Sequence, residues 1–212
     1  MSLTKEKIKK DSTIKFINKN KFNKMNTNIV KIKKKESITI GIIIPVTSRK
    51  RNYKKVEDTD FFRILFKSFL NSYNRDGNYK YNFYLGYDND DKYFIDNKEK
   101  IIQHFEKIKG NNMSISLIII ENMQGKVGKI WSKLAEIASK DCKYLYQLGD
   151  DINIITAGWE DIFIKKLAET NNIGVTGPLD LTNHKILTQS FVNIIYGMFT
   201  FFNEKDTTYI LT

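Results

Sequence analysis

The chain has 212 residues, of which 41% are hydrophobic and 13% aromatic, a composition typical of one globular domain. No apolar run approaches the roughly 18 to 20 residues that a membrane-spanning helix needs, so a transmembrane protein is not expected. A single cysteine, Cys142, excludes an internal disulfide framework. The sequence therefore predicts a protein of a reducing compartment, the cytoplasm, or the host cytoplasm if the chain is viral.

The net charge of +11 is concentrated in residues 1–35. This segment holds twelve lysines against two acidic residues, a net of +10, whereas the remaining residues carry 23 basic and 22 acidic side chains. Such a composition predicts a basic, disordered N-terminal arm before a single domain over residues 36–212. Weak contact of the arm with an anionic membrane face or with RNA is an alternative, whereas a specific nucleic-acid partner is not expected.

Strand and helix patterns alternate along the rest of the chain. The first strand, residues 37–46, is apolar on both faces and should end at Pro45, because proline cannot donate to a sheet ladder. The elements that follow are a helix over 60–73, an aromatic strand over 79–87, a helix from about 93 to 108, a buried strand over 115–120, a helix over 130–139 and a strand from Tyr144. This alternation predicts an α/β fold with a doubly wound, mostly parallel central sheet flanked by helices.

Three predicted strands end in polar or acidic segments, at residues 47–51, 88–91 and 149–151. In open α/β sheets ligands bind beyond the carboxyl ends of strands, so these three ends can converge on one site. Asp150 and Asp151 would repel each other at the end of a buried strand unless a cation, a ligand or several donors compensate. Oxygen ligands of this kind suit Mg²⁺ or Mn²⁺. An Asp-rich turn that merely ends the strand is the alternative.

The segment Gly125-Lys-Val-Gly-Lys129 precedes a predicted helix. Free amide groups, the helix dipole and the lysine charges could hold a phosphate there. The segment is not a P-loop, because Met123 stands where that motif has glycine and Ile130 where it has a hydroxyl.

The remaining polar residues support fewer interpretations. Asp88 and Asp90 either accept hydrogen bonds from a nucleobase or ribose, or cap a turn. His104 and His184 lie far apart without nearby cysteines, so they make no convincing zinc site. Cys142 has no evident histidine partner, and nucleophilic hydrolysis therefore lacks support.

Four motifs follow one another in order: Ile42-Ile-Ile-Pro-Val-Thr47, an aromatic strand into Asp88-Asn-Asp90, the Gly/Lys helix start, and Gln147-Leu-Gly-Asp-Asp151. This order resembles nucleotide-sugar glycosyltransferases of the GT-A fold, in particular family-2-like sequences and the small glycosyltransferases of large DNA viruses. The resemblance covers about residues 38–200, and residues 177–197 resemble the acceptor-side half of such enzymes. It implies transfer of a sugar from a nucleotide-sugar, a UDP-sugar in the first place, to a glycan or glycoprotein acceptor.

The resemblance also implies roles for single residues. The residues at the end of the first strand would hold the nucleotide: Pro45, Val46, Thr47 and Arg49. Asp88 and Asp90 would contact the uracil-ribose side, and Lys126 or Lys129 would face the diphosphate.

The Asp-x-Asp motif of the family falls on residues 149–151. Asp151 would bind the Mn²⁺ or Mg²⁺ that bridges the diphosphate, and Asp150 would touch the ribose or donor sugar, which makes these two the catalytic candidates. The metal and the lysines would offset charge on the departing nucleoside diphosphate.

Two departures from the family pattern keep other hypotheses open. Gly149 replaces the first acid of Asp-x-Asp, and no acidic, Trp-containing motif follows residues 196–197. The chain is then truncated at its C-terminus, one domain of a longer ancestor, or inactive, and a catalytically impaired nucleotide-sugar-binding protein is the second hypothesis. A nucleic-acid-binding protein driven by the arm is the third, and deletion of residues 1–35 would separate it from the other two.

Overall fold

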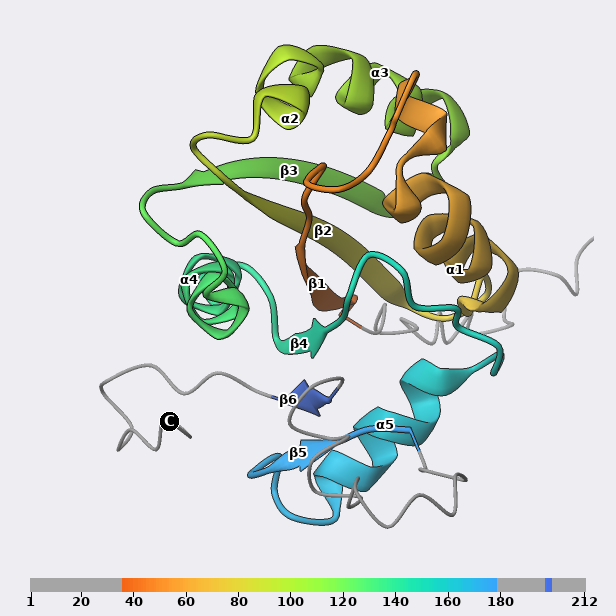
Figure 1. Cartoon of the computed structure of the whole chain (residues 1–212). Coiled ribbons are helices and arrows are strands. Elements are labelled where there is room, and N and C mark those ends of the chain that lie inside the picture. Colours follow the sequence, from red (N-terminus) through yellow and green to blue (C-terminus); the bar gives the residue numbers. More distant parts are fainter. Residues whose placement is uncertain (1–35, 179–196, 200–212) are drawn as a thin grey trace, which may run out of the picture. The chain divides into compact units, whose positions relative to one another are not determined.

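The computed structural model describes residues 36–178 and 197–199 (Figure 1). The chain divides into two units, residues 1–34 and 35–212, and every described residue belongs to the second. The expected basic arm, His184 and most of the segment expected on the acceptor side therefore lie outside the described residues.

The described strands form one six-stranded sheet of order β3-β2-β1-β4-β6-β5. The pairs β1–β2, β2–β3 and β1–β4 are parallel, whereas β6 runs antiparallel to both β4 and β5. The strands are β1 (Ile38–Pro45), β2 (Tyr79–Asp88), β3 (Met113–Ile120), β4 (Tyr144–Gln147), β5 (Val175–Thr176) and β6 (Met198–Phe199). The predicted α/β class with a mostly parallel sheet flanked by helices is confirmed at this level.

Strand β1 lies at the centre of the parallel part and is covered on both faces. Ile42 belongs to the larger core cluster, on one face, and Ile43 to a second cluster on the other, and both side chains are fully buried. Beyond Pro45 one further backbone bond continues the ladder, from Val46 N to Gly86 O at 2.8 Å. The predicted end of the strand at Pro45 is confirmed.

Helices cover both faces of the sheet. The larger core cluster takes side chains from a π-helical turn, Phe61–Phe66, which continues into α1 (Lys67–Ser72), and from α2 (Lys92–Asp96), α3 (Lys98–Ile108) and α5 (Trp159–Ala168). The second cluster takes its helical side chains from α4 (Val127–Ala138). Figure 1 shows α2 and α3 on the opposite side of the sheet from α4. None of the helices in the described part of the chain has the length and apolar character needed to cross a bilayer.

The helix predicted from 93 to 108 is two helices. Asn97 ends α2 and begins α3, with φ −108° and ψ 11°, and its side chain donates to Tyr93 O at 2.9 Å. Asparagine competes for backbone hydrogen bonds in this way, which explains the break. Helix α5 was not among the predicted elements, and its Trp159, only 2% exposed, is a core residue.

Gly86 in β2 allows α4 to lie close to the sheet. A Cβ placed there would stand 3.0 Å from side-chain atoms of Ile120, Ile130 and Leu134. Because this spacing is tighter than ordinary van der Waals contact, a larger residue would push the helix away. The close packing helps to hold α4 against the sheet, with its N-terminus following the carboxyl end of β3.

Candidate functional site

The order of strands reverses at β1. Strands β2 and β3 lie on one side of β1 and β4 lies on the other, all parallel. Ligands of open α/β sheets bind at such a switch point, outside the carboxyl ends of the strands. Pro45 and Val46, at the end of β1, and Gly149, just beyond β4, flank this point. The three predicted polar segments therefore follow the three adjacent strands β2, β1 and β4.

The loop after β1 is held by Asp91, which is 3% exposed. Its Oδ2 accepts hydrogen bonds from Ser48 N at 2.7 Å and Thr47 Oγ1 at 3.2 Å, and its Oδ1 accepts from Ser48 Oγ at 2.7 Å. Asp91 also caps α2, because Oδ1 accepts from Phe94 N at 3.4 Å. Sequence reasoning gave this residue no role, although an aspartate just before a helix is a typical N-cap.

Arg49, Asp88 and Asp90 lie together, so three of the predicted site residues share one cluster. Arg49 Nη1 contacts Asp88 Oδ2 at 2.6 Å, and its Nη2 contacts Asp90. Gln124, which sequence reasoning missed, donates to Asp90 from the loop before α4. The other carboxylate oxygen of Asp88 is buried and finds no hydrogen-bond partner among the described residues. The cluster thus keeps one buried acceptor for a donor that the described chain does not supply.

The acid pair follows β4. Burial raises the pKa of Asp150 to about 6, with a further contribution from Asp151, while Arg51 acts in the opposite direction. Asp151 is exposed, and a Cβ added at Gly149 would stand 3.0 Å from Asp151 Oδ1. Gly149 therefore allows the carboxylate of Asp151 to fold back over the backbone.

The described part of the chain contains no group of three or more His, Cys, Asp or Glu side chains arranged to hold a metal. Mg²⁺ and Mn²⁺ are often bound by one or two carboxylates together with water and substrate phosphates. The exposed Asp151 could supply one such ligand, with Asp150 beside it in the chain. The two carboxylates do not make a complete protein cage for a metal.

The start of α4 lies between the ends of β2 and β4. Gln124 connects the preceding loop to Asp90, and Trp131 Nε1 donates to Leu148 O at 3.2 Å, one residue before Gly149. The predicted phosphate-binding residues Lys126 and Lys129 are both exposed there. The structure thus brings the lysines to the same edge of the sheet as the acid pair.

A second charged cluster surrounds Asp60, whose side chain is 2% exposed. Its Oδ2 contacts Arg51 and accepts from Tyr53 Oη at 3.1 Å, and its Oδ1 contacts Arg63 Nη2 at 2.5 Å. Burial raises the pKa of Tyr53, and the negative charge of Asp150 contributes in the same direction, which places Tyr53 within electrostatic range of the acid pair. Sequence reasoning noted the basic run that includes Arg51 but could not find its partner.

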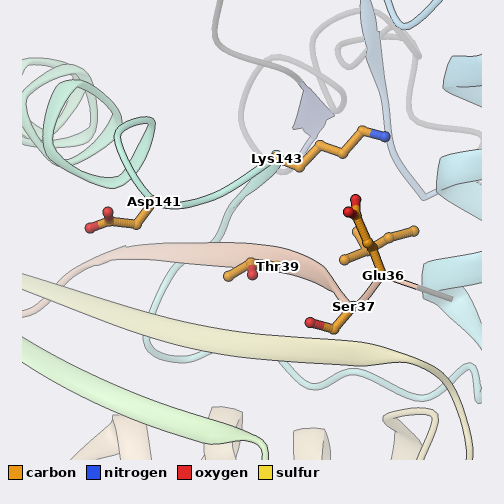
Figure 2. Close-up of a pocket in the computed structure, with 6 residues that line it drawn as sticks. Glu36, Ser37, Thr39, Asp141 and Lys143 are labelled. Atoms are coloured by element: carbon orange, nitrogen blue, oxygen red, sulfur yellow. The ribbon is translucent and has the colours of Figure 1, made fainter. Parts of the chain in front are cut away.

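A polar hollow of about 290 Å³ lies at the other ends of the strands, where β1 and β4 begin (Figure 2). Its lining comes from the start of β1, with Glu36, Ser37 and Thr39, and from the segment before β4, with Asp141 and Lys143. The charged side chains among them are exposed and none is buried, as in an ordinary solvated edge.

Comparison of the chain with known protein families found no match, and comparison with curated proteins found no relative.

Proposed function

We propose that the chain is a GT-A-like glycosyltransferase of the cytoplasm, or of the host cytoplasm if the chain is viral. It would transfer a sugar from a UDP-sugar or similar nucleotide-sugar to a glycan or glycoprotein acceptor. One observation carries the proposal: three adjacent parallel strands end in polar segments beside the switch point, and the exposed Lys126 and Lys129 lie at the start of α4 at the same ends of the strands. Such a place accommodates a ligand that has both a nucleoside and a phosphate part.

The nucleoside would lie over the ends of β1 and β2. The buried, unpartnered oxygen of Asp88 is suited to accept from an N–H of a base, and Asp90 from a ribose hydroxyl. Arg49 holds both carboxylates in place. Pro45, Val46 and Thr47 would form the floor beneath the nucleotide.

The diphosphate and the donor sugar would lie toward β4. Asp151 would hold Mn²⁺ or Mg²⁺ together with the phosphates, and Asp150 would contact the ribose or the sugar. A bound metal of this kind supplies Lewis-acid stabilisation of the leaving diphosphate. Lys126 and Lys129 would orient the phosphates and offset their charge from the other side.

A second candidate function is nucleotide-sugar binding without efficient transfer. Gly149, in place of a carboxylate, favours it, because one metal ligand of the expected motif is missing. Transfer with inversion also needs a carboxylate base near the acceptor hydroxyl, and the described residues suggest no candidate for it.

The test is a screen of UDP-glucose, UDP-galactose, UDP-N-acetylglucosamine and GDP-mannose with and without Mn²⁺. Thermal stabilisation reports binding, and nucleoside diphosphate released over hours reports turnover. We expect one donor to bind with Mn²⁺ and to be hydrolysed slowly, and Asp151→Asn to lose both effects. Asp141→Asn, an exposed carboxylate at the opposite edge, is the matched control. Binding without turnover would favour the second function, and no binding of any donor would exclude both.

A further inference from the structure

Arg49 and Arg51, both in the loop after β1, belong to two ion-pair clusters of opposite sign. In the first, two carboxylates, Asp88 and Asp90, share the guanidinium of Arg49, which leaves a formal charge of −1. In the second, the guanidinium groups of Arg51 and Arg63 share the carboxylate of Asp60, which leaves +1. The negative cluster is accounted for by the proposed nucleoside site, and the positive one has no assigned ligand.

The positive cluster has hydrogen-bond donors to spare. The side chains of Arg51 and Arg63 are 37% and 61% exposed, and each contacts the buried Asp60 through one terminal nitrogen. A guanidinium carries five N–H donors in a planar fork that matches phosphate geometry. The segment 49–55 adds three exposed lysines, and the acidic residues Glu57 and Asp58 follow it. The surplus charge is therefore accessible, whereas the carboxylate that fixes it is not.

The cluster also lies beside the proposed active site. Arg51 and Tyr53 both interact electrostatically with Asp150. The loop beyond the acid pair is bonded to α1, since Ile154 N donates to Ser68 Oγ at 3.0 Å. Arg63 belongs to the π-helical turn that continues into α1, and this turn packs in the larger core cluster. Lys126 and Lys129 lie at the start of α4, which packs in the second cluster, on the other face of the sheet.

We propose that Arg51 and Arg63, positioned by Asp60 and Tyr53, form a phosphoryl-binding subsite on the α1 side of Asp150. Asp60 fixes the two guanidinium groups in advance, so that less side-chain freedom is lost when an anion binds. The identity of the phosphoryl group as the diphosphate of the donor rests on the proposed function. The subsite itself rests on the charges and contacts of the cluster.

The experiment is calorimetric titration of the full-length chain with pyrophosphate, inorganic phosphate, UDP and uridine, in chelator and about 0.15 M salt, where exposed charges are screened over about 8 Å. The variants are Arg63→Gln and the double change Arg51→Gln with Arg63→Gln. Arg75→Gln is the matched control, because Arg75 is an exposed arginine in the turn before β2. Any nonspecific binding by the basic N-terminal segment is common to all variants and cancels in the comparison.

We expect pyrophosphate and UDP to bind the double variant at least tenfold more weakly than the wild type, with Arg63→Gln intermediate and Arg75→Gln unchanged. Since the double change could unfold the chain, the melting curve of the double variant is measured alongside. If that variant is unfolded, Arg63→Gln, which keeps Arg51 paired with Asp60, serves as the test by itself. Unchanged pyrophosphate affinity in a folded arginine variant would overturn the subsite. So would a wild type that binds no pyrophosphate.

Together with the nucleotide-sugar screen in Mn²⁺ described above, applied to the same variants, these titrations separate the subsite from the proposed function. Arginine-dependent binding of pyrophosphate in a chain that binds no nucleotide-sugar would keep the subsite and remove the glycosyltransferase. Normal binding and hydrolysis of a nucleotide-sugar by the double variant would keep the glycosyltransferase and show that the arginines do not bind the diphosphate of the donor. Inorganic phosphate bound as tightly as pyrophosphate and UDP would keep the subsite and assign it to a single phosphate group.

Discussion

Asp91 accepts hydrogen bonds from both the backbone N–H and the hydroxyl of Ser48, each 2.7 Å long. One buried carboxylate thus fixes the loop after β1 to the start of α2, and it caps that helix through Phe94 N as well. The loop continues directly into Arg49, so this contact helps to position the guanidinium that pairs with Asp88 and Asp90.

Asp91→Ala should destabilise the fold by about 2–4 kcal/mol, because it removes an N-cap and leaves partly buried donors of Ser48 unpaired. The measurement is urea unfolding followed by circular dichroism. Asp96→Ala, an exposed aspartate of α2, is the control and should change the unfolding free energy by less than about 0.5 kcal/mol. Equal stability of the two variants would show that the Ser48 contact is not formed.

Gly86→Ala should be destabilising by about 1–3 kcal/mol, because the added methyl group would meet three side chains of the β2–α4 interface at 3.0 Å. Gly128→Ala, in α4, meets no atom within 4 Å and should stabilise by up to about 1 kcal/mol, since alanine favours helix. Paired melting curves of the two variants test the packing of α4. A Gly86→Ala protein as stable as the wild type would contradict it.

Glu160 should make stability fall as the pH rises. Its side chain is fully buried, and burial raises its pKa above the ordinary 4.5, although hydrogen bonds from Tyr81 and Asn74 N lower it in part. The native state then holds this proton more tightly than the unfolded state does. The contribution is therefore complete below the unfolded pKa and is lost as the pH rises through the native pKa.

The measurement is the unfolding free energy of wild type and Glu160→Gln from pH 4 upward, a range of about 3 pH units that starts near the ordinary glutamate pKa. Glutamine cannot ionise. The unfolding free energy of the variant should therefore rise relative to that of the wild type by about 1 kcal/mol or more across that range. Glu121→Gln, at an exposed residue after β3, is the control. The difference between its unfolding free energy and that of the wild type should stay constant with pH. A constant difference between Glu160→Gln and wild type would mean that Glu160 is not a perturbed acid.

Asp151→Ala should remove the Mn²⁺-dependent stabilisation by UDP. In the wild type, UDP with Mn²⁺ at about 100 times its dissociation constant should stabilise the native state by roughly 2.7 kcal/mol, which is readable as a melting shift. Without ligand the variant should melt at the same temperature as the wild type, because the side chain of Asp151 is exposed. If the shift with UDP and Mn²⁺ persists in the variant, Asp151 does not hold the metal.

The sequence alone determined the features that depend on local pattern. The apolar run of β1 and its end at Pro45, the aromatic strand β2 and the acid pair after β4 were all predictable, because strand periodicity and proline act within a few residues. The convergence of the polar strand ends followed from the expected α/β class alone. The break at Asn97 and helix α5 were missed, since capping asparagines and partly polar helices give weak periodicity.

Only the tertiary structure decided which charged groups meet. Arg49 faces Asp88 and Asp90, whereas Arg51, two residues on, faces Asp60. Nothing in a run of basic residues distinguishes the two, because the partner of each depends on how the loop after β1 passes over the sheet. The insertion of β6 between β4 and β5 likewise joins residues more than fifty positions apart, such as Tyr146 and Met198. Contacts of this range form only when the core has fixed the positions of the elements that carry them.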